Sequence, residues 1–236
     1  MEQYRYECPS VEALVQRAVV LAQKGYVYFL HGELRAGRDP RATDEKLLEK
    51  SNARHTKDQR YIRKRKGKAN AHYFRWDRLW VVMMTEGTHP MKERRAKERL
   101  LDLRNRDHAP LRLGPYSVKL RCDSTPKGRA SGRYRASVRL AERAYLELKT
   151  ELVDIALHRS AEKLAARVFR LPYQPYGPVY RQILAVVKAV NVRRRGAGYE
   201  PVPLSCVRFR RDLPKHFVQR DGDGLRALEG EMGRAA

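Results

Sequence analysis

The sequence contains few cysteines and few acidic side chains. Its three cysteines, Cys8, Cys122 and Cys206, are an odd number and lie far apart. Such spacing fits neither a disulfide framework nor the paired-cysteine motif of a zinc site. We therefore expect three small, reduced, hydrophobic side chains, as in a protein of the reducing cytoplasm.

Long apolar segments are also missing. No stretch approaches the roughly 20 apolar residues that a membrane-spanning helix needs. The first residues, MEQYRYECPS, are acidic and aromatic, which is not typical of a signal peptide. We expect a cytoplasmic protein with no membrane partner.

Several motifs that mark enzymes are absent as well. The sequence has no glycine-rich nucleotide-binding loop and no His-Glu-x-x-His zinc motif. The triplet His31-Gly32-Glu33 lacks the downstream Cys-x-x-Cys pair of a zinc deaminase. The acidic segment DPRATDEK at 39–46 fits the start of a helix better than a nuclease motif. We predict neither a bound metal nor a cofactor.

Positive charge, by contrast, is abundant. The chain has 51 Lys and Arg residues against 27 Asp and Glu, which gives a formal net charge of +24. Residues 1–50 hold eight basic and eight acidic residues, so the whole excess lies after residue 50. Because such a field attracts phosphate polymers, nucleic acid is the partner that we predict.

The densest basic segment is RHTKDQRYIRKRKGK at 54–68, with eight basic residues and one acid. Like charges this close repel one another unless anions screen them, so we predict that the segment follows a phosphate backbone. Tyr61 and Trp76 bracket the cations and suit stacking on unpaired bases. The alternative is a solvated helix face. The predicted contacts are Arg60, Tyr61, Arg63, Lys64, Arg65, Lys66, Lys68, Arg75 and Trp76.

The order of elements predicts an α+β fold. Helices are expected from Ser10 to about Gly25, from Asp39-Pro40 to about Lys50, and from Thr88 to about Leu103. The basic segment either extends the second helix or forms a loop. Strands are expected at 26–34, 70–78, 79–87, 110–122 and 132–140. The first four strands with their helices give the ferredoxin-like order β-α-β-β-α-β.

The strand at 70–78 alternates between two faces. If one face stays free of helices, it presents aromatic rings with a cation or a histidine, as His72, Phe74 and Trp76 would. The alternative is that all these rings belong to the core.

The sequence becomes helical after Leu140. We predict a ferredoxin-like core with an N-terminal helix at 1–140, a helical part on or beside it at 141–220, and a flexible tail at 221–236. The helical part holds two further basic patches. Arg193, Arg194 and Arg195 close a predicted helix, and Arg208, Arg210 and Arg211 lie along a predicted strand, SCVRFRR. Cations at a helix end also suit the helix dipole, which is the structural alternative for the first patch.

Two metal-free catalytic possibilities remain. A histidine beside the basic segment can act as general base on an RNA 2′-hydroxyl, and His31, His72 and His89 are the candidates. A tyrosine can act as nucleophile on DNA, and Tyr176 and Tyr180 lie in the segment YQPYGPVYRQ. For each residue a structural role is the alternative.

The ferredoxin-like order beside a basic helical part is similar to CRISPR RNA-processing endonucleases and to plasmid replication initiators. The first usually carry a glycine-rich loop near the C-terminus, of which RRRGAGYEP is at most a fragment; the second carry paired histidines that this sequence lacks. The function that we predict is binding of RNA, or of single-stranded or structured DNA. A metal-independent nuclease, a replication initiator of a mobile element and a scaffold in a ribonucleoprotein are the alternatives.

Overall fold

The computed structural model describes residues 4–93, 99–124, 130–172, 176–208 and 215–217 as a mixed α+β structure with two antiparallel sheets. The helices are α1 (Val11–Gln23), α2 (Pro40–Ser51), α3 (Lys57–Arg65), α4 (Glu142–Asp154), α5 (Ala161–Phe169) and α6 (Gly177–Gly196). Short 3-10 turns are η1 (Pro90–Lys92), η2 (Ile155–Leu157) and η3 (Leu204–Cys206). The strands are β1 (Tyr28–Glu33), β2 (Ala71–Trp76), β3 (Leu79–Met84), β4 (Leu101–Asp102), β5 (Leu111–Leu113), β6 (Tyr116–Ser124) and β7 (Ala130–Leu140).

The first sheet has the strand order β2-β3-β1-β4. Its β2–β3 hairpin confirms the predicted strand pair, and Trp76 pairs with Leu79 across the two-residue turn Asp77-Arg78. Asp77 has a φ of 47°. Aspartate tolerates this left-handed conformation, which a tight hairpin turn needs, so the turn forms without the usual Asn-Gly pair.

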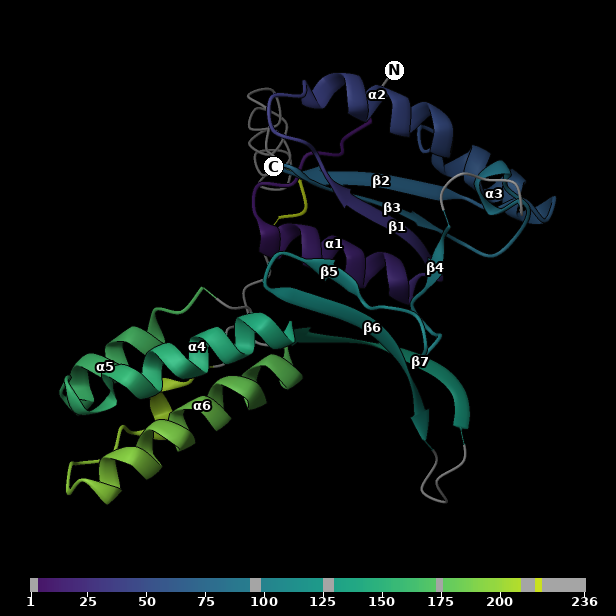
Figure 1. Cartoon of the computed structure of the whole chain (residues 1–236). Helices are drawn as coiled ribbons and strands as arrows, with labels where there is room; N and C mark the ends of the chain where they lie inside the picture. Colours follow the sequence, from purple (N-terminus) through teal and green to yellow (C-terminus); the bar gives the residue numbers. More distant parts are fainter. Residues whose placement is uncertain (1–3, 94–98, 125–129, 173–175, 209–214, 218–236) are drawn as a thin grey trace, which may run out of the picture.

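Helices cover both faces of the first sheet (Figure 1). On one face α1 packs against Phe29 and Phe74, and on the other α2 packs against Tyr73. The predicted boundaries of α1 and α2 are confirmed within a residue or two. Ser10 caps α1 by accepting a hydrogen bond from the Ala13 N–H at 3.2 Å, and Asp39 caps α2 through the Arg41 N–H at 2.9 Å.

The second sheet lies on the far side of α1 and has the order β5-β6-β7 (Figure 1). The prediction of one strand at 110–122, placed fourth in the first sheet, is wrong. Gly114, with a φ of 56°, and Pro115 form a two-residue turn that divides this segment into β5 and β6. Glycine at the first turn position and a proline without an N–H favour a hairpin over a continuous strand.

The predicted charged helix at 88–103 is also wrong. The described part of this segment contains only the turn η1, followed by β4, which pairs with the edge of β1. Residues 94–98 lie outside the described structure. Leu103 follows β4 and is buried, so pairing and burial at the β1 edge outweigh the helix propensity of the charged residues.

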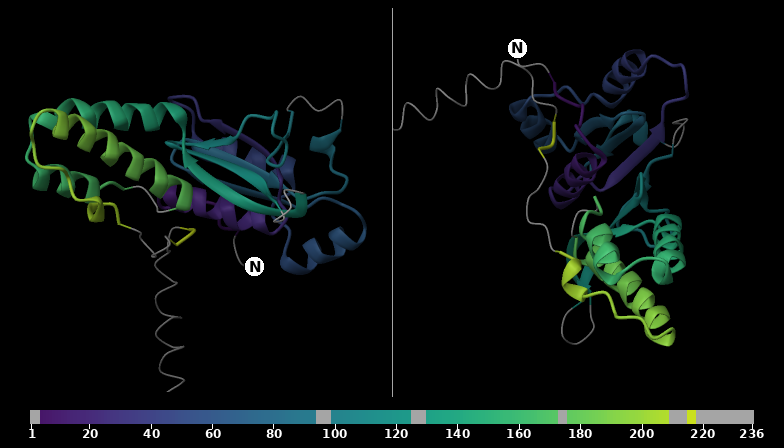
Figure 2. Two further views of the ribbon diagram at one scale, coloured as in Figure 1. Left: turned by 90° about the horizontal axis from the view of Figure 1, so that it is seen from below. Right: turned by 90° about the vertical axis from the view of Figure 1, so that its left-hand side faces the viewer.

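Helices α4, α5 and α6 pack beside the end of β7 (Figure 2). Ser160 caps α5 by accepting from the Lys163 N–H and so separates α5 from α4. Gln182 of α6 bonds both backbone groups of Leu140, accepting from its N–H at 2.8 Å and donating to its C=O at 3.2 Å. In this way the α6 side chain satisfies the backbone at the free edge of β7. The apolar face of α6 joins one continuous core with α1 and the inner face of the second sheet.

No helix among the described residues combines the length and the apolar character that crossing a bilayer requires.

Candidate nucleic-acid interface

The basic segment 54–68 is neither an extension of α2 nor a loop. Asn52, with a φ of 52°, ends α2 in the left-handed conformation, and α3 begins anew at Lys57. A capping box starts it: the Thr56 hydroxyl accepts from the Gln59 N–H at 3.3 Å, and the Gln59 amide oxygen accepts from the Thr56 N–H at 2.9 Å. The charged segment is therefore helical because its ends are well capped.

Two of the predicted phosphate contacts on α3 hold the helix to the protein. An Arg63 guanidinium nitrogen donates to the carbonyl of Ala69 at 2.8 Å, and an Arg60 nitrogen lies 3.4 Å from Nε2 of His72. The Arg60 carbonyl also accepts from the Asn70 amide at 2.8 Å. Both side chains are only partly exposed, so their charge is less available to a ligand than the sequence suggested.

The other side of α3 is open to solvent. Tyr61 and Ile62 are 63% and 51% exposed. The exposed cations from α3 onward are Lys57, Lys64, Arg65, Lys66 and Lys68, and Arg54, which precedes α3, is exposed and paired with Glu45. They form a basic helix face with one exposed aromatic ring.

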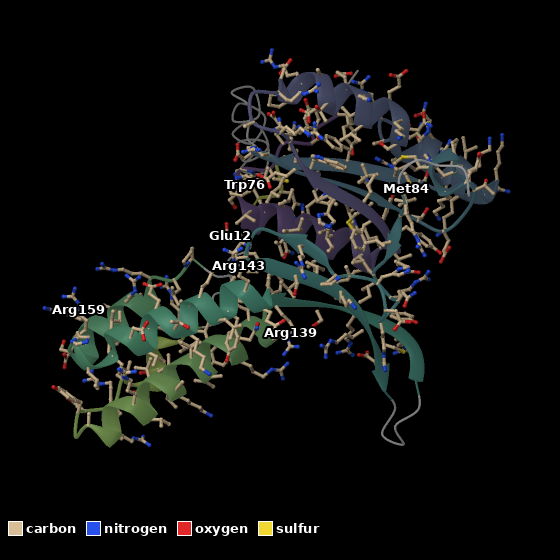
Figure 3. All side chains as sticks on the ribbon, in the orientation of Figure 1. Glu12, Trp76, Met84, Arg139, Arg143 and Arg159 are labelled. Carbon is tan, nitrogen blue, oxygen red and sulfur yellow. The ribbon has the colours of Figure 1, made fainter. Side chains whose placement is uncertain are left out.

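The structure does not bring Trp76 to this helix. The chain enters β2 from α3 at Ala71, and Trp76 is the last residue of the strand, roughly 17 Å away at 3.4 Å per residue. Figure 3 shows Trp76 at the opposite end of the first sheet from α3. Trp76 is partly buried against the hydrophobic core that includes α1, Phe29 and Phe74. The predicted pair of stacking rings around the basic segment is therefore not assembled.

The aromatic rings of the first sheet are core residues. Tyr73 and Phe74 on opposite faces of β2 are both buried, because α2 and α1 cover the two faces. The possibility of an open aromatic sheet face does not hold for the described structure.

Arg75, a predicted nucleic-acid contact, is an internal ion-pair partner. It is 8% exposed, and its Nε donates to the fully buried carboxylate of Asp44 at 2.9 Å. A second nitrogen donates to Glu7 at 2.7 Å. Tyr73 also donates to Asp44, and burial together with this carboxylate raises the pKa of Tyr73. Arg75 compensates a buried charge and is not available to phosphates.

The arginine triplet at the end of α6 divides in the same way. Arg194 is 2% exposed and donates to three backbone carbonyls, those of Glu200 at 2.6 Å, Arg159 at 2.7 Å and Ala156. Arg193 and Arg195 are exposed. Only these two remain available to a ligand.

The third predicted patch is only partly described. Arg208 is exposed, with its guanidinium 3.9 Å from the centre of the Phe169 ring. Arg210 and Arg211 lie outside the described residues.

The three histidine candidates do not meet on a basic surface. Burial, followed by the charges of Arg17, Arg60 and Lys24, lowers the pKa of His72 to about 3, so this buried imidazole is neutral at physiological pH. His89 is buried too; its Nδ1 accepts from the Met91 N–H and its Nε2 lies 3.1 Å from the Ser51 carbonyl. Each imidazole is thus held within the structure.

His31 is half-buried and stacks on Phe29. Burial lowers its pKa, and the charge of Arg112 lowers it further. It is the one histidine candidate that lies close to a cation of the second sheet.

The tyrosine candidates lie at the start of α6. The Tyr176 hydroxyl donates to the Gln16 side chain at 2.8 Å, and burial raises the pKa of Tyr176. Tyr180 packs against the main core. A raised pKa opposes the deprotonation that a tyrosine nucleophile needs, so the geometry favours structural roles. Among the described residues no cluster of His, Cys, Asp or Glu could hold a metal ion.

A second basic surface, which was not predicted from the sequence, lies on the second sheet. Strand alternation buries Leu111, Val118 and Val138 against α1 and turns their neighbours outward. The outward cations form what we call the basic sheet face: Arg112, Lys119, Arg121, Arg133, Arg135 and Arg139.

Strand pairing brings these cations together from distant parts of the sequence. Arg112 and Arg139 flank Ser117 in one row across the sheet. In the next rows Lys119 is opposite Ser137, and Arg121 is directly opposite Arg135. Neighbouring strands are only about 4.8 Å apart, so each row places positive charges side by side.

The base of the basic sheet face is a cleft of about 870 Å³ between the sheet and the first turns of α4 and α6. Arg181 of α6 joins Arg112, Arg121 and Arg139 in its lining, with Tyr145 at one side. None of the four arginines is ion-paired with a carboxylate of the described residues. Figure 3 shows Arg139 on the second sheet and Arg143 on α4 at this end of the sheet.

The sequence did carry a signal for this surface. In VKLRC, Lys119 and Arg121 alternate with apolar residues, and in GRYRASVRL the positions 133, 135 and 139 are arginines on one face of the predicted strand, with Ser137 between them. The pairing of the two strands, which puts the cations of both on one face, could not be predicted from these local patterns.

No protein-family model, curated protein or solved structure matches this chain.

Proposed function

We propose that this protein binds nucleic acid and holds its phosphates on the basic sheet face. The observation that carries the proposal is the row arrangement of the cations, with Arg112 and Arg139 flanking Ser117 and Arg121 opposite Arg135. The carboxylate that pairs there is Asp123, 2.7 Å from Arg135. Like charges directly opposite each other destabilise a sheet, so a bound polyanion would relieve this repulsion.

The residue types support a phosphate ligand. Five of the six cations of the basic sheet face are arginines. Arginine presents a planar fork of donors that matches phosphate oxygens in pairs, which a lysine ammonium does not. The small side chains of Ser117 and Ser137 leave space between the cations for a chain to lie close to the sheet.

The exposed side of α3 is a second surface that a bound chain can contact. Its Lys64, Arg65 and Tyr61 keep the character that the sequence predicted. We propose it as an auxiliary contact, because Arg60 and Arg63 face inward and Trp76 is distant.

We also propose that the first sheet is a reduced ferredoxin-like unit. Its antiparallel order β2-β3-β1-β4, with α2 and α3 between β1 and β2, supports this idea. The described part of the connection from β3 to β4 holds only η1 in place of the second helix. An experimental structure with a regular helix-to-sheet packing in this unit would support the assignment, and a different strand order would contradict it.

A salt titration with matched variants tests the binding proposal. Affinity for a labelled RNA strand and a labelled DNA duplex is measured by anisotropy for the wild type, for Arg112→Gln/Arg139→Gln/Arg181→Gln, and for the control Lys188→Gln/Arg193→Gln/Arg195→Gln. Both variants lose three positive charges, and the control residues are exposed in the C-terminal half of α6.

We expect the sheet variant to lower affinity by roughly 100-fold, because it removes three charge-assisted contacts. The slope of log affinity against log salt should fall by about one unit per lost contact. The control should change affinity only through the long-range field. Equal effects of the two variants, or a salt-independent affinity, would contradict the proposal.

A further inference from the structure

The outer ends of β6 and β7 form an arm that leaves the body of the protein. β5 pairs only with Tyr116–Val118 of β6, so from Lys119 onward the sheet has two strands. On the inner face burial ends along the arm: Leu120 is buried, whereas Tyr134 is 45% exposed. Figure 1 shows this end of β6 and β7 extending away from the other elements.

The body of the protein holds the start of the arm, where the Leu120 N–H donates to the Leu103 carbonyl at 3.0 Å and Lys119 Nζ donates to the Arg106 carbonyl at 2.8 Å. Beyond Leu120 the described inner face is no longer buried, so core packing does not explain the length of the arm.

Residues 119–124 of β6 span roughly 17 Å at 3.4 Å per residue. A two-stranded ribbon in water is only marginally stable. In addition, Arg121 and Arg135 are directly opposed, and Asp123, 2.7 Å from Arg135, offsets only one of these two charges. A ribbon that carries opposed cations into solvent is better explained by a polyanion that it contacts than by folding.

The shape and the side chains together favour a double helix over a single strand. Proteins that bind single strands use exposed aromatic rings on which bases stack. The described outward residues that share the cationic face of β5, β6 and β7 include no aromatic ring: the exposed ring of Tyr134 is on the opposite face of the arm, and Tyr145 lies beside the cleft. A two-stranded β-ribbon, by contrast, fits the roughly 12 Å wide major groove of B-form DNA.

The major groove also distinguishes duplex DNA from duplex RNA. The major groove of A-form RNA is deep and too narrow for side chains to read, whereas that of B-form DNA is open. In this groove arginine can contact a guanine edge with two hydrogen bonds. Arg121 and Arg135 are on the arm, where Arg121 also lines the neighbouring cleft, and Arg112, Arg139 and Arg181 line the rest of that cleft.

We propose that the β6–β7 arm enters the major groove of B-form duplex DNA. Arg121 and Arg135 face the base edges, and the three arginines at the base hold flanking phosphates. This inference rests on the proposed nucleic-acid binding and names its ligand class.

The first test compares three ligands of equal length and sequence: duplex DNA, single-stranded DNA and duplex RNA. We expect duplex DNA to bind at least about tenfold more tightly than the other two. The arm variant Arg121→Gln/Arg135→Gln should reduce this preference. The cleft variant Arg112→Gln/Arg139→Gln should weaken binding to all three ligands alike, because contacts to phosphates do not distinguish one groove from another.

The second test uses competitors that occupy one groove. Methyl green, which binds the major groove, should displace the protein from duplex DNA, and netropsin, which binds the minor groove, should not. Thermal melting by circular dichroism checks that each variant is folded.

The inference is overturned if single-stranded DNA or duplex RNA binds as tightly as duplex DNA, if netropsin alone competes, or if the arm variant weakens all three ligands equally. These results do not contradict the proposed function, provided that binding still depends on the cleft residues Arg112, Arg139 and Arg181. If none of the three ligands binds, the proposed function itself fails.

Discussion

The two basic regions of this chain, α3 and the basic sheet face, are built in opposite ways. In α3 the cations are neighbours in sequence, but the helix turns successive side chains by about 100°, so Arg60 and Arg63 face the protein and Lys64 and Arg65 face solvent. In the sheet, Arg112 and Arg139 are far apart in sequence and flank one serine. The density of charge in a sequence is therefore a poor guide to its density on a surface.

Single arginines differ in the same way: some stabilise the fold, and others are available to a ligand. Arg75 and Arg194 are buried and bonded to protein acceptors, whereas Arg121 and Arg139 are exposed and unpaired with described carboxylates. The following predictions separate these two roles, beginning with the largest expected effect.

Removing Arg194 should unfold the helical part more readily than removing its neighbour. Arg194→Met leaves three backbone carbonyls without their donor, of which that of Ala156 is buried, and we expect a loss of roughly 3 kcal/mol in the free energy of unfolding. The same change at exposed Arg195 should cost less than about 0.5 kcal/mol. Urea denaturation followed by circular dichroism measures both values. Similar losses for the two variants would show that burial does not distinguish them.

A single carboxylate should weaken nucleic-acid binding more on the sheet than on α3. Ser137→Glu places an acid opposite Lys119 and beside Arg139, and we expect a loss of affinity of roughly tenfold or more. Ile62→Glu places the same charge on the exposed side of α3, and less than about threefold is expected there. Anisotropy titrations at one fixed salt concentration compare them. A larger loss of affinity from Ile62→Glu would mean that α3 is the main nucleic-acid-binding surface.

Acid should destabilise the inward side of α3 through His72. Because the folded pKa of about 3 is below the unfolded value of 6.5, folding favours the neutral imidazole. Its contribution is full above pH 6.5 and is lost as the pH falls toward 3, with a slope of up to about 1.4 kcal/mol per pH unit. In His72→Gln this extra slope should disappear from unfolding free energies measured between pH 7 and pH 4. An unchanged slope would mean that His72 does not titrate in this way.

The parts of the fold that local chemistry determines could be predicted from the sequence. Ser10 and Asp39 mark helix starts by their side-chain oxygens, and aromatic and apolar runs mark β2 and β3. The division of β5 from β6 depended on the Gly114-Pro115 turn, whose signal was present but was weaker than the apolar alternation on both sides.

The candidate site could not be predicted to the same extent, because it depends on tertiary pairing. Arg193, Arg194 and Arg195 look equivalent in the sequence, and only the carbonyls of Ala156 and Arg159 make the middle one structural. Likewise, the pairing of Arg121 with Arg135 follows from the register of β6 and β7, which local patterns do not fix.

The most direct test of the central claim is photocrosslinking from one position in each basic region. A photoreactive phenylalanine analogue replaces Ser117, between Arg112 and Arg139, or Ile62 on the exposed side of α3, and the protein is irradiated with labelled nucleic acid. We expect a strong crosslink from position 117 that added salt abolishes, and a weak one from position 62. A crosslink from position 62 alone would contradict the account and place the phosphates on α3.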